Sequence, residues 1–456
     1  MGNIKPQSAP LNPAFEKYTK ANSGNIKTSA IKKHGTGYIP PPVDLSHVKE
    51  SQNVAVEAQA FPAHYDLREH DKVTSVKDQD QTGTCWIFAT YGSLESYLMP
   101  GQPHNFSEQS MKDLLSSSCP QGFDRGYNAG GNEFMSTAYL ARWSGPVLER
   151  DDPFNPDTGG YCTQFPVNKH VQRVVFIPPR SSFTSNSIIK NTIIKYGAML
   201  SSMYMNETAY YRASTAAYYY YGTRDTNHCI DIIGWDDNYS RNNFRRRPPG
   251  NGAFIAKNSW GTDFGKKGYF YISYFDTRIG LENAMYNSAQ SPGNFKRIYQ
   301  YDPLGWTATI GYSSPTAWFA NLFRVAATEK LRAVSFYTTG LQTSYTIYIY
   351  TGVQASKPRS GTLKLKQSGS INYPGFYTVN LSSPVQLTSG SRYSIVVKVN
   401  TPGSIYPIAT EMPIFDYSSK ARAQAGQSFI SSNGTNWDDT TTFFPNTNVC
   451  LKGYSR

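Results

Sequence analysis

The chain has 456 residues, more than one compact core usually organises, so we expect at least two folded units. It carries a formal net charge of +12, and 34 Tyr and 24 Phe supply much of its apolar surface. No run of about 18 apolar residues occurs, which excludes a hydrophobic membrane-spanning helix. Five cysteines are too few for a disulfide scaffold, and their odd number leaves at least one thiol unpaired.

The first 60 residues are rich in Pro, Lys, Ser and Asn and predict an extended lead segment. One short helix is expected at residues 13–19, and three prolines stiffen residues 40–42. The opening Met-Gly does not indicate myristoylation, because Pro6 stands where that motif needs Ser or Thr. No apolar stretch of a secretory signal is present, so either the protein is cytoplasmic or a signal precedes this numbering.

Helix signals come first along the rest of the chain, and strand signals follow. Helices are expected at residues 86–98, after the capping Ser107, and at 132–143. Past residue 171 short alternating runs predict strands, and the two parts together predict an α+β unit. After a Pro- and Gly-containing linker at 287–296, alternating runs predict a β-sandwich, with strands at 330–339, 343–352, 361–369, 375–383 and 391–400.

Cys85 is the candidate nucleophile. It stands directly before the expected helix and follows Gly83, which permits a tight turn. A helix N-terminus favours the thiolate of a cysteine, whose thiol otherwise titrates near ~8.5. The position of Cys85 therefore supplies one of the two devices that activate a catalytic thiol.

The second device is a histidine that becomes imidazolium beside the sulfur. His228 begins an apolar, strand-like run in NHCIDIIGWDD, and Asn258 lies further along in AKNSWGTDFG. The Asn258 carbonyl is suited to orient the imidazole, and Trp260 is suited to shield that bond from water. An oxyanion donor is also needed, and we assign it to Gln79, with Gln81 as a competitor.

These segments resemble motifs of the papain family of cysteine proteases. VKDQDQTGTCWIFA resembles the family's cysteine segment, FSEQSMKDL its following helix, NAGG its glycine loop, NHCIDIIGW its histidine strand and KNSWGTDFGKKGYFYI its asparagine motif. YDLRE resembles the start of mature family members. The similarity covers about residues 61–286, half of the chain, with the motifs in the family's order, and we assign residues 61–289 to this domain and 290–456 to the next.

The resemblance implies a helical left subdomain and a β-barrel-like right subdomain with the active cleft between them. It assigns Cys85, His228, Asn258 and Gln79 to catalysis. It places Gly130 and Gly131 on the cleft wall, where close backbone approach favours glycine. Glu133 falls in the main specificity pocket, where an acid would favour Lys or Arg in the substrate. The alternative is a one-residue alignment slip that leaves Glu133 on the surface.

The cysteines depart from the family pattern. Thr82 and Asn128 replace two cysteines that pair in family members, so we expect packing alone to hold the loop around Cys85. Cys119 and Cys162 match a second family disulfide, which we expect to form. Cys229 and Cys450 have no family partner and are expected to be buried free thiols.

Both flanks add expectations. Residues 1–60 occupy the place of the family's inhibitory propeptide, which lies in the cleft, often in the reverse direction to substrate; a disordered tail is the alternative. Residues 290–456 resemble the lectin-like domain of bacterial and archaeal cell-surface cysteine proteases, through YQYDPLGW, GQSFISSNGTNWDD and NVCLKGYS. Trp437 with Asp438 and Asp439 suits sugar stacking or calcium ligation, and a core role is the alternative.

We therefore predict a cysteine endopeptidase that forms a thioester on Cys85 and is made as a self-inhibited zymogen. The alternatives are a non-catalytic surface or carbohydrate-binding protein and a papain-fold transpeptidase or amidase. No cofactor or metal is required, although a structural calcium ion is conceivable. The expected partners are peptide substrates and a cell-surface glycan, without nucleic acid, because no such motif accompanies the basic run Arg245–Arg247. We expect a secreted or surface monomer, since a disulfide and a lectin-like domain suit that location.

Overall fold

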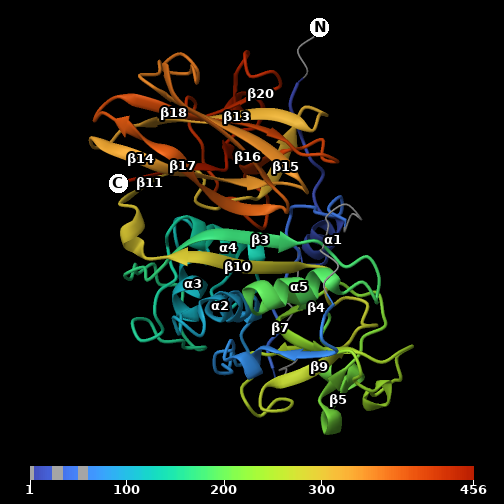
Figure 1. The fold of residues 1–456 in the computed structure, drawn as a ribbon. Coiled ribbons are helices and arrows are strands. Elements are labelled where there is room, and N and C mark those ends of the chain that lie inside the picture. The colour runs from blue at the N-terminus through green and yellow to red at the C-terminus, as the bar shows by residue number, and fades with distance from the viewer. Residues whose placement is uncertain (1–4, 23–33, 50–59) are drawn as a thin grey trace.

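The computed structural model describes residues 5–22, 34–49 and 60–456 (Figure 1). The Met-Gly opening and residues 50–59, next to the expected processing junction, lie outside these ranges. No helix in the described ranges is long and apolar enough to cross a membrane. The helices are α1 (Pro13–Asn22), α2 (Cys85–Leu98), α3 (Glu108–Leu114), α4 (Glu133–Ala141), α5 (Ser187–Tyr196), α6 (Glu207–Tyr210) and α7 (Thr440–Phe443).

The expected helices are confirmed, with shifted ends. Helix α2 begins at Cys85 itself, and Ser107 accepts the Ser110 N–H as the N-cap of α3. Asn132 caps α4 by accepting two backbone N–H groups, which sets the start of that helix at Glu133. Helix α2 is buried almost all round, because α3 and α4 cover one side and strands cover the other.

A thirteen-stranded sheet runs through both halves of the molecule, which Figure 1 shows as the continuous band on which the helices pack. In spatial order its strands are β11 (Arg297–Tyr299), β23 (Leu451–Ser455), β14 (Glu329–Thr338), β17 (Gly375–Leu387), β3 (His170–Ile177), β10 (Asn283–Gln290), β4 (Met199–Met203), β7 (His228–Asp236), β8 (Ala253–Lys257), β9 (Tyr269–Ser273), β6 (Ala217–Tyr218) and β5 (Tyr211–Arg212), with β2 (His64–Asp66) paired to β7.

The two halves join by strand pairing. Strand β17 of the C-terminal half pairs antiparallel with β3 of the first half, with Gly375 opposite Val175 and Tyr377 opposite Arg173. The expected linker at 287–296 is partly wrong, because residues 287–290 belong to β10 and pair with β3. Backbone hydrogen bonds across this edge satisfy groups that would otherwise be exposed, so the two halves form one sheet.

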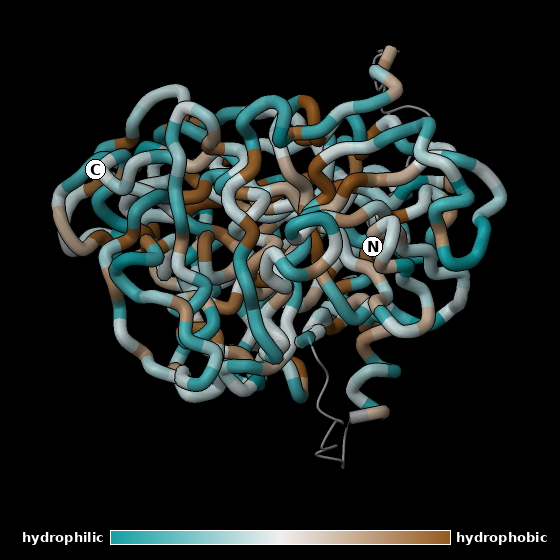
Figure 2. Tube along the Cα trace, turned by 90° about the horizontal axis from the view of Figure 1, so that it is seen from below, coloured by the Kyte–Doolittle hydropathy of each residue, from teal (hydrophilic) through white to brown (hydrophobic). Residues whose placement is uncertain are grey.

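The C-terminal half is a sandwich, as expected. A six-stranded sheet packs its inner face against β14 and β17 around a core that includes Phe319, Phe336 and Val397. Its strands, in order, are β16 (Thr362–Ile371), β15 (Thr343–Thr351), β18 (Arg392–Asn400), β13 (Thr316–Arg324), β20 (Ser428–Ser431) and β21 (Asp438–Asp439). Figure 2 shows hydrophobic segments running through the interior of the molecule.

The N-terminal segment is attached to the C-terminal half. A four-stranded sheet consists of β1 (Gln7–Ser8), β12 (Ala308–Gly311), β19 (Ile408–Glu411) and β22 (Asn448–Val449), so the lead segment adds its edge strand. Phe15 of α1 then packs edge-on against Tyr417, with ring centroids 5.6 Å apart. The segment is therefore ordered by long-range contacts that its own composition does not indicate.

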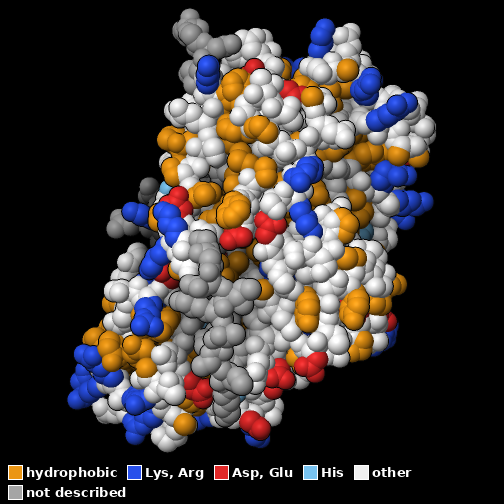
Figure 3. Space-filling model, turned by 180° about the vertical axis from the view of Figure 1, so that it is seen from behind, with side chains coloured by type: hydrophobic (Ala, Val, Ile, Leu, Met, Phe, Trp, Pro, Cys, Tyr) orange, Lys and Arg blue, Asp and Glu red, His pale blue; other side chains and the backbone are white. Residues whose placement is uncertain are grey.

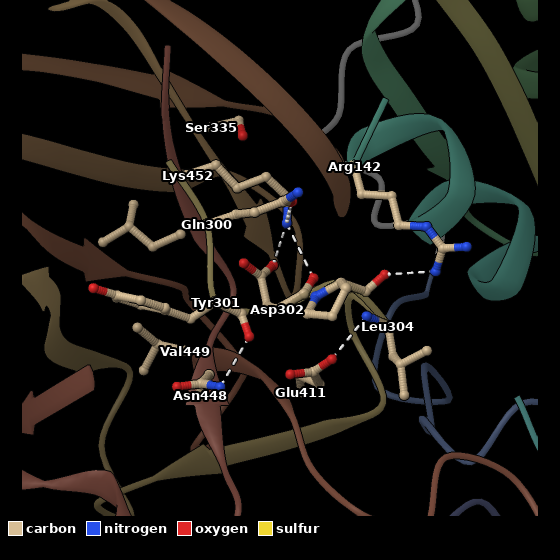
Figure 4. Close-up of polar contacts among 12 residues, drawn as sticks. Arg142, Gln300, Tyr301, Asp302, Leu304, Ser335, Glu411, Asn448, Val449 and Lys452 are labelled. Atoms are coloured by element: carbon tan, nitrogen blue, oxygen red, sulfur yellow. Dashed lines mark hydrogen bonds and ion pairs between the residues drawn. The ribbon is translucent and has the colours of Figure 1, made fainter. Parts of the chain in front are cut away.

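Charge is distributed unevenly over the surface. On the face seen in Figure 3, Lys and Arg side chains gather along the upper right edge, over the C-terminal half, with few acidic side chains beside them. A buried ion pair lies at the junction of the halves (Figure 4). The Lys452 Nζ is 2.7 Å from Oδ2 of Asp302, and neither side chain is more than 1% exposed. Arg142, which follows α4, donates to the Pro303 carbonyl at 3.1 Å and fastens the same loop to the first half.

Candidate active site

The sulfur of Cys85 lies at the N-terminus of α2, and the side chain is completely buried. Helix α2 packs directly on β7, the strand that begins with His228. Gly83, just before the helix, packs against the loop at residues 128–130, because a Cβ there would lie 2.9 Å from the Asn128 carbonyl oxygen. The nucleophile and its base therefore come from a helix and a strand that pack against each other.

His228 is oriented as the sequence predicts. Its Nε2 lies 2.8 Å from Oδ1 of Asn258, which directly follows β8. The Trp260 ring covers this pair, with its centroid 4.7 Å from that of His228. Asn258 occupies Nε2, so the buried Nδ1 is the nitrogen left to exchange a proton with Cys85, whose pKa the charge and a hydrogen bond of His228 lower.

The pKa of the Cys85 thiol is shifted well below its usual value by opposing effects. Burial alone raises the pKa, since an apolar site disfavours the thiolate. A hydrogen bond from Cys229 and the positive charge of His228 outweigh burial and lower it. Cys229 is a free buried thiol, as expected, but its contact with the nucleophile is a role that the sequence analysis missed.

Gln79 is fixed as an amide donor. Its Oε1 accepts a hydrogen bond from Ser259 at 2.6 Å, which orients Nε2 toward the cleft. Nε2 donates to the Thr82 carbonyl at 2.7 Å and to the Gly35 carbonyl at 3.3 Å. Ser259 was not identified from the sequence, although it belongs to the same motif as Asn258.

The expectation that packing alone holds the loop around Cys85 is wrong. The Gly83 N–H donates to the Asn128 carbonyl at 2.8 Å, directly where the family disulfide is absent. Arg125, also missed from sequence, lies over the Trp86 ring and donates to the Tyr127, Ala129 and Gly130 carbonyls. Hydrogen bonds therefore stand where the covalent link is missing.

Residues 37–39 of the N-terminal segment pair with the glycine loop. The Gly131 N–H donates to the Gly37 carbonyl at 2.9 Å, and the Ile39 N–H donates to the Gly131 carbonyl at 3.1 Å. This bridge is parallel. A Cβ on Gly130 would lie 2.5 Å from the Gly37 oxygen, so both loop glycines lie on the wall that the resemblance implies.

Residues 34–37 lie directly over the catalytic groups. The Gly35 carbonyl accepts hydrogen bonds from Trp260 Nε1 at 3.0 Å and from Gln79. A Cβ on Gly37 would lie 1.9 Å from the Gly83 carbonyl oxygen, and one on Gly35 would lie 2.1 Å from the Thr82 oxygen. Only glycine permits this approach, and it leaves Cys85 without solvent contact.

Glu133 is buried, which contradicts the surface alternative. Its Oε1 accepts a hydrogen bond from the Tyr38 hydroxyl at 3.4 Å, and its Oε2 has no hydrogen-bond partner among the described residues. Burial and then the charge of Glu282 raise its pKa to about 8. Both acids line a cavity of about 410 Å³ that residues 41–49 of the N-terminal segment close.

The acidic pair near Trp437 stands at the start of α7. Asp439 caps α7, accepting from the Thr441 N–H at 3.0 Å, and also accepts from Gly426. Trp437 is half-buried against the outer face of the six-stranded sheet. In the described ranges, acidic and histidine ligands converge only at His64, Asp66 and Glu69, where Arg68 already pairs with Asp66.

The disulfide between Cys119 and Cys162 is present, as expected, and Cys450 is a buried free thiol. Beneath α2 lies a buried ionic group that the sequence analysis did not identify. Lys77 donates to Glu95 at 3.2 Å and to Glu108 at 2.7 Å, tying α2 to α3. These contacts position the helix that carries the nucleophile.

Two families match the chain. The family described as "Papain family cysteine protease" matches residues 61–289, and that described as "Lectin like domain" matches residues 298–455. A probable cysteine protease of Arabidopsis thaliana is 28% identical over 234 residues, which are 49% of this chain and 61% of that protein. Cysteine proteinase 1 of Zea mays is 30% identical, over 50% of this chain and 61% of that protein. The chain thus matches about three fifths of the length of these relatives.

One solved structure is similar over the whole chain. The cysteine protease and lectin-like domains of Cwp84, a surface layer associated protein of Clostridium difficile, superpose with a TM-score of 0.83 at 26% identity, covering 100% of this chain and 99% of that one. The same clostridial protease after propeptide cleavage gives a TM-score of 0.74 at 28% identity, covering 86% of this chain and 99% of that one.

We expect Cys229→Ala to raise the pKa of the Cys85 thiol, because it removes a hydrogen bond to the thiolate and leaves the charge of His228. A raised pKa means that the thiolate is lost at a higher pH. In protein trimmed of residues 1–60, the acid limb of the iodoacetamide alkylation rate should move up by about one pH unit. Cys450→Ala is the matched control and should leave it unchanged; an unmoved limb in Cys229→Ala would contradict the assignment.

We expect Arg125→Met to destabilise the loop, because four carbonyls, those of Lys112, Tyr127, Ala129 and Gly130, lose their donor. In the full chain carrying Cys85→Ala, the free energy of unfolding in urea should fall by about 3 kcal/mol. Adding Thr82→Cys with Asn128→Cys should recover part of the loss once the pair is oxidised, whereas Thr82→Ser with Asn128→Ser should not. Full stability of Arg125→Met would show that packing alone suffices.

Proposed function

Because the chain belongs to the papain family of cysteine proteases, we propose that it is a cysteine endopeptidase that residues 1–60 keep as a self-inhibited zymogen. One observation carries the proposal: residues 34–39 lie across a catalytic group that is already assembled. A zymogen, which is activated by removal of the segment, fits this arrangement better than a non-catalytic protein of the same fold. A non-catalytic protein would not need to retain all four catalytic side chains.

In the proposed reaction the Cys85 thiolate attacks the scissile carbonyl, and the negative charge moves to the carbonyl oxygen. The Gln79 amide and the Cys85 N–H donate to that oxygen. His228 then gives its proton to the leaving amine as the C–N bond breaks, which leaves a thioester on Cys85. Water, deprotonated by His228, hydrolyses the thioester and restores the thiol, while Asn258 keeps the imidazole in place.

The proposed inhibition has a stereochemical basis. The Gly35 carbonyl accepts the hydrogen bond of the Gln79 amide that the substrate oxyanion would need. The segment is anchored outside the cleft, where β1 pairs with β12, and on both of its walls, because the Tyr38 N–H donates to the Asn227 carbonyl and its hydroxyl donates to Glu133. Removing residues 1–60 would therefore free the oxyanion donor, the glycine loop and the Glu133 pocket together.

We propose that Gly130 and Gly131 pair with an extended substrate and that Glu133 selects its side chain. The support is geometric: the Gly131 N–H and carbonyl already pair with a chain segment in the cleft. Glu133 and Glu282 give the neighbouring cavity acidic walls, which favours a Lys or Arg side chain. Trp260 would form the wall on the leaving-group side, where it stacks on His34 at 4.5 Å.

We propose a location outside the cell or at its surface, where the disulfide is stable and where the clostridial relative acts as a surface layer associated protein. The C-terminal half would hold the protease at a surface by binding a glycan, in keeping with its match to a lectin-like family. The catalytic proposal invokes no cofactor and a monomeric chain, since every proposed group comes from one protomer.

Self-processing tests the proposal. The wild-type chain, incubated at mildly acidic pH, should lose about 60 residues and gain hydrolysis of a fluorogenic peptide, whereas Cys85→Ala should stay intact. Gly37→Ala should process faster, because its Cβ cannot lie 1.9 Å from the Gly83 oxygen and the segment must lift. Gly101→Ala, where no atom lies within 4 Å of the added Cβ, is the control.

A Cys85→Ala chain trimmed as fast as wild type would refute self-processing. Absence of peptide hydrolysis after trimming would refute the endopeptidase itself. Transfer of the acyl group to an added amine in excess of hydrolysis would favour the transpeptidase alternative, since both reactions share the thioester.

Glu133 is tested by substrate preference in the trimmed enzyme, at pH 9, above the pKa of about 8 that burial gives it. The ratio of kcat/KM for Arg over Leu at the second residue before the scissile bond should fall about tenfold in Glu133→Gln. Glu207→Gln, which makes the same charge change elsewhere in the cleft, should keep the ratio. Equal ratios in wild type and Glu133→Gln would exclude the pocket role.

A further inference from the structure

The outer face of the six-stranded sheet carries an aromatic layer, and the loop at Gly434 packs on part of it, over the Trp318 ring. Along β13 the side chains alternate, so that Phe319 enters the sandwich core and Trp318 points outward. Tyr348 on β15 lies outward beside Trp318, with ring centroids 5.6 Å apart and planes 25° apart. Trp437 packs against the same outer cluster. All three rings are half-buried, so their edges and part of their faces reach the surface.

Three cations lie over these rings. The Lys398 Nζ is 5.4 Å from the Trp318 centroid, and the Lys366 Nζ is 5.8 Å from that of Tyr348. Strand register enforces this placement, because Lys398 is directly opposite Trp318 and Lys366 is directly opposite Tyr348. Cation–π contacts therefore hold the two ammonium groups on one face of the sheet despite their mutual repulsion.

Arg359 is the third cation and is held most firmly. Its Nε donates to the Tyr350 hydroxyl at 3.0 Å and its Nη1 to the Gly434 carbonyl at 2.6 Å. Its guanidinium carbon is 5.7 Å from the Trp318 centroid. These contacts occupy Nε and Nη1 and hold the guanidinium in place, although Arg359 is exposed. A guanidinium oriented in this way is suited to a carboxylate or phosphate.

A surface cavity of about 740 Å³ opens beside Arg359. Lys357 and Trp437 line it together with neutral side chains that can form hydrogen bonds, which are Ser356, Ser360, Thr435 and Asn436. None of the residues that line the cavity is acidic. The nearby Asp439 is directed away, to the start of α7. The C-terminal end of the molecule also shows Lys and Arg side chains with few acidic ones beside them in Figure 3.

We propose that this face, formed by Trp318, Tyr348, Arg359, Lys366, Lys398 and the adjoining cavity, binds an anionic polysaccharide, a sugar polymer that carries carboxylate or phosphate groups. The cations meet the anionic groups, and the hydroxyl and amide side chains meet the sugar hydroxyls. A nucleic acid fits less well, because Arg359 and Lys398 cover the Trp318 ring on which a base would stack. The inference rests on the glycan-binding role proposed for the C-terminal half and does not depend on peptidase activity.

The test is equilibrium binding of the full chain carrying Cys85→Ala, which prevents self-cleavage. The probes are polygalacturonate for carboxylate, polyglycerol phosphate for phosphate, dextran as a neutral glycan and single-stranded DNA. At physiological salt we expect one or both acidic polymers to bind more tightly than dextran and DNA. Lys366→Gln with Lys398→Gln should weaken that binding about tenfold, because two charge-assisted contacts are lost.

Lys330→Gln with Arg332→Gln is the matched control, because it removes the same charge from exposed positions of another sheet, on β14. Its affinity should stay within about twofold of the parent, because these residues lie outside the proposed site. Attraction that depended only on overall charge would weaken both double variants equally. Preference for polygalacturonate or for polyglycerol phosphate identifies which anion the site recognises. Equal weakening by both double variants would overturn the site.

Tighter binding of DNA would also overturn the site in favour of a nucleic acid. Binding of dextran as tight as that of the acidic polymers would overturn the anionic specificity and leave the glycan role standing. No binding of any glycan would overturn both. Because the peptidase is measured separately in the wild-type chain, none of these outcomes is confused with a failure of the proteolytic proposal.

Discussion

The complete burial of the Cys85 sulfur is the constraint on which the rest of the structure depends. A thiolate without solvent is unfavourable by itself, and the low pKa of Cys85 requires compensation from nearby groups. Cys229 and His228 supply it, and both stand at the start of one strand, β7. The packing of α2 on β7 therefore brings Cys85 next to the two groups that lower its pKa. Asn258 fixes the imidazole, and the Lys77 ion pairs fix the helix.

The same burial explains the loops around the site. The backbone must approach closely at Gly83, Gly37 and Gly131, and a Cβ at any of them would collide with a neighbour. In place of a disulfide, Arg125 gathers the carbonyls of the glycine loop. Burial lowers the pKa of Arg125 to about 9, and the charge of Asp113 opposes this shift.

The C-terminal half is joined both to the first half and to the N-terminal segment. Strand β17 continues the sheet through β3, and Tyr417 reaches across to donate to Asn132, the residue that caps α4 beside the cleft. The N-terminal segment uses this half as its anchor through β1 before it enters the cleft. The papain-like half, the N-terminal segment and the C-terminal sandwich are therefore joined by backbone pairing. This pairing explains why the lead segment is ordered despite its polar composition.

The sequence by itself determined the local elements and the catalytic group. Short-range patterns predicted α2, α4 and the sandwich strands, and the spaced motifs identified Cys85, His228 and Asn258, because each motif encodes its own turn or strand. Only the tertiary structure decided what surrounds them. The contact of Cys229 with Cys85, the substitution of Arg125 for a disulfide and the burial of Glu133 depend on segments far apart in the chain. Such contacts arise from the packing of whole elements, and no local pattern of residues records them.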